Sequence, residues 1–113
     1  MKSDLLLSKD KKITIVCRVE AGCLGPNGDD HVEGFCSFAK YEYETLNSNI
    51  MNWEIVPRYD KSQPEIQYKV NDKLLTHDKA ERYLEVFDKN INDFEEQLHD
   101  KLVVLIDQYL EGG

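Results

Sequence analysis

A chain of 113 residues is the size of one ordinary domain, and we expect a single domain over residues 1–113. Hydrophobic residues make up 41% and charged residues 32%, near the averages of globular proteins, which argues against wholesale disorder. Twenty-two acidic against fourteen basic residues give a formal net charge of −8, a sign that repels phosphate groups. We therefore expect no nucleic-acid partner and no binding to an anionic membrane.

The first twelve residues, MKSDLLLSKDKK, contain an apolar run of only three leucines, which we interpret as a short edge strand or an arm over the core. A signal peptide needs a longer apolar core, and a membrane span needs about twenty apolar residues. The chain also holds three cysteines, an odd number that is typical of reduced thiols. These features predict a cytoplasmic protein.

Three stretches alternate between apolar and polar residues, which is the pattern of half-buried β-strands. The first covers residues 12–20, with Ile13, Ile15, Cys17 and Val19 on its apolar face and Val16 among the polar residues. The second runs from Met51 to Ile55 and is ended by Pro57, and the third covers residues 66–70. A polar connection, residues 58–64, joins these two strands. The tight-turn signal at residues 71–73 leaves room for a short fourth strand.

A glycine-rich segment, residues 21–28, separates the first strand from a predicted helix. It fits neither of the common phosphate-binding patterns, and two aspartates follow it where a phosphate would bind, so we do not expect a nucleotide site. Asp30 and Glu33 have the spacing of a capping box, which predicts a helix beginning at Asp30. We expect this helix to reach about residue 45, although residues 41–45 also alternate like a strand.

The second helical pattern begins after Thr76, a good N-cap residue, and has apolar residues at steps of three and four up to Tyr109. A single helix over residues 77–110 would be about 51 Å long, whereas a domain of this size has a radius of gyration of about 13 Å. We therefore consider a break near residues 89–93, where Asn92 and Glu95 could form a new cap. The unbroken apolar spacing across that point is an argument against the break, so a broken and a continuous helix both stay open.

These elements predict an α+β fold in the order β-α-β-β-(β)-α. Strands that are neighbours in sequence usually pair antiparallel, and their apolar faces need a cover. We expect a two-layer sandwich of a three- or four-stranded, mainly antiparallel sheet with two helices on one face, one of them the long C-terminal helix. The predicted core consists of Ile13, Ile15, Val19, Phe35, Ala39, Trp53, Ile55, Ile66, Tyr68, Leu84, Phe87 and Phe94.

Three cysteines and a histidine, Cys17, Cys23, His31 and Cys36, are the closest approach to a chemical site. Structural zinc sites bring ligands in close pairs two to four residues apart, and the spacings here are six, eight and five. Cys17 and Cys36 also lie on apolar faces, where cysteine acts as a small hydrophobic residue. We therefore expect buried thiols and no metal. A thiol-dependent enzyme or hydrolase that uses Cys23 and His31 near the glycine-rich loop is the alternative.

The C-terminal helix carries five successive apolar residues, 102–106, and residues at about 100° per step surround a helix. One sheet face cannot cover a helix that is apolar all round. We therefore predict an interaction surface at Leu102, Val103, Val104, Ile106 and Leu110, and a non-enzymatic adaptor, chaperone-like protein or regulatory subunit without catalytic residues or cofactor. Its partner would be another protein or a second copy of the chain, with a two-fold homodimer as the commonest solution.

Overall fold

The structure is a computed structural model that describes residues 11–46, 48 and 50–112, so the leucine run at residues 5–7 lies outside the described residues. Its elements are the strands β1 (Ile13–Val19), β2 (Met51–Pro57), β3 (Ile66–Val70) and β4 (Lys73–Leu74), the helices α1 (Gly28–Tyr43), α2 (His77–Val86) and α3 (Ile91–Gly112), and the 3₁₀ turn η2 (Ala21–Leu24). Every helix within these residues is too short or too polar to cross a membrane.

The four strands form a mixed sheet in the order β2-β1-β3-β4. β1 pairs parallel with β2 and antiparallel with β3, and β3 pairs antiparallel with β4. The α+β class and the long C-terminal helix are confirmed, but the mainly antiparallel sheet and the count of two helices are wrong. α1 carries the chain back to the end of the sheet where β1 began, and such a crossover makes the next strand parallel.

The connection between β2 and β3 crosses the end of β1, which explains why these two neighbours in sequence do not pair. The Arg58 backbone N–H donates to the Val19 carbonyl at 2.8 Å, and the Arg18 N–H donates to the Glu65 carbonyl at 2.7 Å. These two bonds fix the connection at both of its ends to the last residues of β1. β3 therefore adds to the free edge of β1 rather than to β2.

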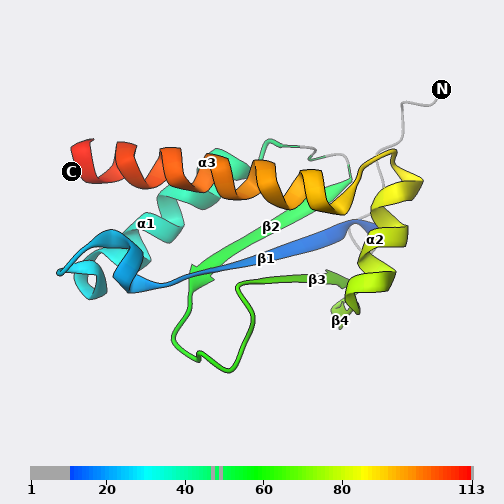
Figure 1. Ribbon diagram of the computed structural model, residues 1–113, viewed down its shortest axis with the longest axis horizontal. Helices are drawn as coiled ribbons and strands as arrows, with labels where there is room; N and C mark the ends of the chain where they lie inside the picture. The colour runs from blue at the N-terminus through cyan, green and yellow to red at the C-terminus, as the bar shows by residue number, and fades with distance from the viewer. Residues whose placement is uncertain (1–10, 47, 49, 113) are drawn as a thin grey trace.

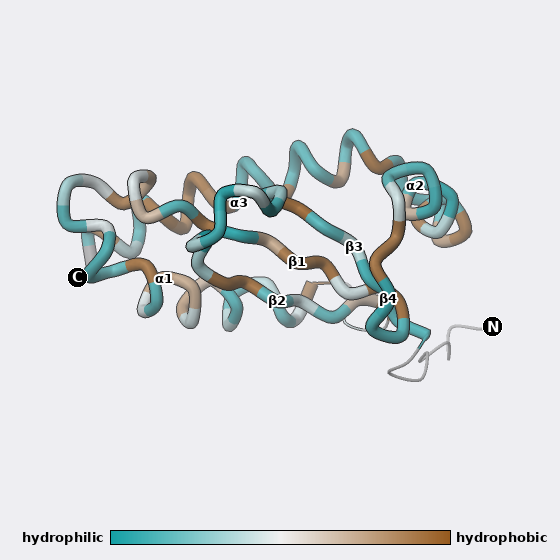
Figure 2. Tube along the Cα trace, turned by 90° about the horizontal axis from the view of Figure 1, so that it is seen from below, coloured by the Kyte–Doolittle hydropathy of each residue, from teal (hydrophilic) through white to brown (hydrophobic). Residues whose placement is uncertain are grey.

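α1 and α3 lie on the same side of the sheet, and α2 lies across one end of it (Figure 1). In the view from below, hydrophobic residues lie along β1 (Figure 2). Nine of the twelve predicted core residues are buried in one cluster, and Ile66, Phe87 and Phe94 are half-buried against it. The strand faces that turn toward the helices therefore supply the core, as the alternation predicts.

The opposite face of the sheet is polar, but Val16 in its centre is only 4% exposed. Its register partners are Glu54 on β2 and Gln67 on β3. The Lys69 ammonium lies 3.3 Å from a Glu54 carboxylate oxygen, so this ion pair joins the two strands on either side of Val16. The aliphatic parts of such long side chains cover apolar surface while their charged ends stay in water.

α1 begins two residues earlier than the predicted start at Asp30. Asn27 is its N-cap residue and makes no side-chain capping bond, while Asp29 and Asp30 lie in the first turn. The predicted capping box is wrong because Asp30 lies inside the first turn of α1 and not at its N-cap, and Glu33 accepts a hydrogen bond from the Tyr59 hydroxyl at 2.7 Å. At its other end α1 reaches Tyr43, and residues 44–46 form a turn, so the strand alternative for residues 41–45 is also wrong.

The predicted long helix is broken, and α2 ends at Val86 in a Schellman motif. The Lys89 N–H donates to the Leu84 carbonyl at 3.0 Å, and the Asp88 N–H donates to the Glu85 carbonyl at 2.9 Å. α2 begins at the predicted cap, where the Thr76 hydroxyl accepts from the Lys79 N–H. α3 is capped by Asn90, whose side-chain oxygen accepts from the Asp93 N–H at 3.0 Å, and not by Asn92 as predicted.

Asp88 closes the Schellman motif in the left-handed conformation, with a φ of 63°. A β-carbon disfavours this conformation by about 1–2 kcal/mol, and a carboxylate is also unfavourable at a helix C-terminus. We expect Asp88→Gly to stabilise the protein by about 1 kcal/mol in urea denaturation. Asp88→Ala is the control, because it removes the charge and keeps the strain. A glycine variant no more stable than the alanine variant would contradict this explanation.

Candidate functional site

The five residues of the predicted interaction surface differ in exposure. Val103, Val104 and Leu110 are 46%, 52% and 45% exposed, which is high for such apolar side chains. Leu102 and Ile106 are half-buried against the core. Leu105, within the same apolar run, is buried. Within the run 102–106, one residue is therefore buried, two are half-buried and two are exposed.

Helical spacing puts four of these residues on one side of α3. Leu102, Ile106 and Leu110 follow one another at intervals of four residues, and Val103 is three residues from Ile106. We call these four residues the apolar stripe. Val104 is separate from it, because it follows Lys101 and Gln97 at intervals of three and seven residues on another side of the helix.

The inner side of α3 is anchored near its end by Tyr109. The Tyr109 ring lies 5.6 Å from the Phe35 ring and 5.7 Å from the Phe38 ring, both on α1. A β-carbon at Gly34 would be only 2.5 Å from the Tyr109 hydroxyl oxygen, so glycine permits this close approach. The stripe therefore lies on a helix whose inner side packs against α1.

Acidic side chains border the stripe on the side that faces away from the core. The exposed ionisable residues of α3, leaving His99 aside, are all acidic: Asp93, Glu96, Asp100, Asp107 and Glu111. The one lysine of α3, Lys101, is half-buried, with its ammonium 5.7 Å from the centre of the Tyr43 ring. A half-buried carboxylate, Glu95, accepts a hydrogen bond from the Tyr68 hydroxyl at 2.6 Å. The outer surface of α3 is therefore apolar and acidic together.

A cleft of about 470 Å³ lies on the Lys101 side of α3, between the end of α1, β2 and the start of α3. Three of its lining residues are aromatic: the Tyr43 and Trp53 rings stack at 5.0 Å, and the Trp53 and Phe94 rings lie 5.9 Å apart. The Trp53 indole N–H donates to the Leu46 carbonyl, and the Tyr43 hydroxyl donates to the Leu98 carbonyl. The polar groups of this cluster thus bond within the protein.

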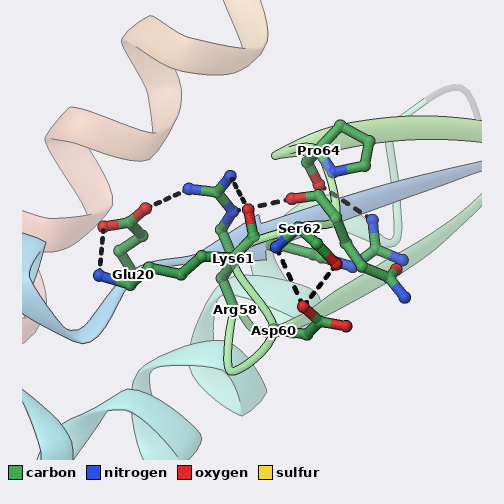
Figure 3. A network of polar contacts seen from close by, with 8 residues as sticks. Glu20, Arg58, Asp60, Lys61, Ser62 and Pro64 are labelled. Carbon is green, nitrogen blue, oxygen red and sulfur yellow. Dashed lines mark hydrogen bonds and ion pairs between the residues drawn. The ribbon is translucent and has the colours of Figure 1, made fainter.

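A second cleft, of about 280 Å³, lies at the carboxyl ends of the parallel strands β1 and β2. Arg58 lines this cleft, and its guanidinium donates to the Glu20 carboxylate (Figure 3). It also donates to the Gln63 carbonyl at 3.0 Å and to the Lys61 carbonyl at 3.1 Å. The Lys61 ammonium lies 3.8 Å from the other Glu20 oxygen. Because Arg58 already bonds to three acceptors, its main effect is to hold the connection between β2 and β3.

Cys23 and His31 do not line this cleft. Cys23 is an exposed residue of η2, and His31 is an exposed residue of α1 whose ring lies 6.4 Å from that of Tyr109. The residues of η2 and α1 that line it are Ala21, Gly22, Asp29 and Val32. Within the described part of the chain, no three histidine, cysteine, aspartate or glutamate side chains gather as metal ligands would.

Cys17 and Cys36 are buried, as predicted, and the two thiols are free. Burial is the main cause that raises the pKa of Cys17 to about 11 and that of Cys36 to about 12. We expect iodoacetamide near neutral pH to alkylate Cys23 alone, because the thiolate is the reactive form. Mass spectrometry after timed labelling measures this.

All three thiols should react in denaturant, which is the control. Equal labelling of Cys17 and Cys23 in the folded protein would show that the core opens. A Cys23 rate far above that of free cysteine would instead favour the thiol-enzyme alternative.

Sequence reasoning missed the bond between Arg58 and Glu20, which are 38 residues apart, and the contact of Lys101 with Tyr43. The only signal for the first was the polar composition of residues 58–64. For the second, the helical spacing of residues 94, 98 and 101 could have indicated that they share one side of α3, but not that Lys101 lies over the Tyr43 ring.

Comparisons with known proteins found no match for this chain among family models, curated proteins or solved structures.

Proposed function

We propose that this protein is a non-enzymatic interaction protein, an adaptor, chaperone-like protein or regulatory subunit, and that the apolar stripe of α3 is its contact surface. One observation carries the proposal: Val103 and Leu110 are close to half exposed although they lie beside the half-buried Leu102 and Ile106. A contiguous exposed apolar patch can mark a protein-interaction site, and the centre of an interface is its most apolar part.

The proposed scaffold is the two-layer sandwich, with α1 and α3 as the layer that covers the sheet. The cluster of buried side chains from β1, α1 and α3 supports this arrangement. We place the protein in the cytoplasm, and its acidic composition supports good solubility there.

The test uses Val103→Asp, which puts a charge in the stripe without disturbing the core. We expect a tagged protein to co-purify a partner in fixed stoichiometry from its own cells, and Val103→Asp to lose that partner. Val86→Asp is the matched control, because Val86 is a 77% exposed valine on another helix. Both variants should melt within a few degrees of the parent protein, as surface substitutions usually do.

The proposal would be contradicted if the parent protein, Val103→Asp and Val86→Asp all co-purified the same amount of partner. Light scattering of each purified protein measures whether the chain associates with itself. Self-association through the stripe would also support the proposal, and only Val103→Asp should abolish it.

A further inference from the structure

We infer that the partner segment which fits the apolar stripe is a cationic amphipathic helix, with an apolar row bordered by lysine and arginine. The inference rests on the proposed function, because it names the chemistry of the partner for the same surface. It is carried by the charges around the stripe and by its helical spacing.

The border of the stripe that faces away from the core is acidic, while the exposed His99 lies four residues before Val103. Asp100 and Asp107 lie three and four residues on either side of Val103, so both are its neighbours on the helix surface. Asp107 is also three residues from Leu110. Both aspartates are exposed, and the chain as a whole carries a formal charge of −8. Opposite charges on a partner would be attracted to this border from a distance, which raises the rate of association.

A second copy of the chain fits this border poorly. A two-fold interface brings the same patch of both copies together, so it gathers the acidic residues of both copies and, where the two α3 helices are antiparallel, sets one acidic border against the other. Like charges placed opposite one another across an interface are costly, and they act against wrong partners. The lysine of α3 cannot relieve this repulsion from its place over the Tyr43 ring, on another side of the helix.

The spacing of the stripe favours a helix over an extended segment. Residues at intervals of four form a ridge along a helix, and such a ridge packs into the groove of a second helix. From Leu102 to Leu110 the ridge is about 12 Å long at 1.5 Å per residue, the length of about two turns of a partner helix. Partner side chains at intervals of three and four residues would match it.

The experiment uses two synthetic helical peptides of 18 residues with the same row of leucines. One has lysine on both borders of the row, and the other has glutamate there. Fluorescence anisotropy at low salt measures the affinity of each peptide for the full chain. We expect the lysine-bordered peptide to bind at least about tenfold more tightly than the glutamate-bordered peptide, and salt to weaken its binding.

Two double variants locate the effect. Asp100→Asn with Asp107→Asn should weaken the lysine-bordered peptide about three- to tenfold, because each of the two exposed charge pairs contributes only modestly. Asp72→Asn with Glu85→Gln removes the same total charge from exposed positions away from α3 and should change the affinity less than about twofold. Val103→Ser, which adds no charge, should weaken both peptides.

Other outcomes would overturn the inference. Equal affinity for both peptides, or equal weakening by the two double variants, would show that the acidic border does not select the partner, and the proposed function would stand. No peptide binding together with a dimer that Val103→Ser dissociates would assign the stripe to a second copy. No peptide binding and no association sensitive to Val103→Ser would remove the proposed function as well.

Discussion

Phe35→Ala should unfold the protein or leave it barely folded. The Phe35 side chain is fully buried on α1, and its ring contacts the rings of Phe38 and Tyr109. Truncating a buried phenylalanine typically costs about 3–5 kcal/mol, a large part of the stability of a small domain. Urea denaturation followed by circular dichroism and by Trp53 fluorescence measures the loss.

Phe87→Ala is the informative comparison for that variant. The sequence places Phe87 in the middle of a helix, where its loss would be as severe, but Phe87 is half-buried just after the last residue of α2. We therefore expect a smaller loss for Phe87→Ala than for Phe35→Ala. The reverse order would mean that the end of α2 is more important to the core than the α1–α3 contact.

The second large effect is expected for Gly28→Ala, at the start of α1. A β-carbon at Gly28 would lie 1.7 Å from the Ala21 carbonyl oxygen and 2.6 Å from its carbon. Both are backbone atoms of η2, so no side-chain rotation can relieve the clash. Overpacking typically costs about 1–3 kcal/mol and occasionally more, and we expect at least the upper value because the backbone itself must move. Thermal unfolding measures it.

Two other glycines of the chain are matched controls for Gly28→Ala. No atom lies within 4 Å of a β-carbon built at Gly22, so Gly22→Ala should be close to neutral. At Gly34 the contact is the hydroxyl end of the Tyr109 side chain, which has more freedom to move, so the loss should be intermediate. A Gly28→Ala protein as stable as Gly22→Ala would show that η2 can be displaced freely.

The local elements were predictable because neighbours in sequence determine them. The alternation over β1, β2 and β3 and the Thr76 cap are confirmed. So is the tight turn, where Asn71 and Asp72 have φ values of 53° and 64°, as a two-residue hairpin requires. The sequence left open whether the helix breaks near residues 89–93. The break is present, but Asp88 and Asn90 make it, because the cap is decided by backbone bonds that a composition pattern does not reveal.

The candidate site was predictable in part. The apolar run at residues 102–106 lies on α3, and the sequence shows that it has more apolar residues than one buried face needs. Which of its residues are outside depends on how α3 is rotated against the sheet and α1. The contact between Gly34 and Tyr109, 75 positions apart in the sequence, helps to fix that rotation. The acidic border was present in the sequence, but its position around the stripe follows from the same rotation.

By itself, the sequence determined the strands, the helical stretches, the buried cysteines and the acidic charge of this protein, because residue type and short spacing decide them. Only the tertiary structure decided that β1 lies between β2 and β3, that β1 and β2 are parallel, and that Val103 and Leu110 face outward. Strand pairing and helix rotation depend on contacts between residues far apart in the chain. For the strands, one such contact is that of residues 58–65, which cross the end of β1 and bond to it.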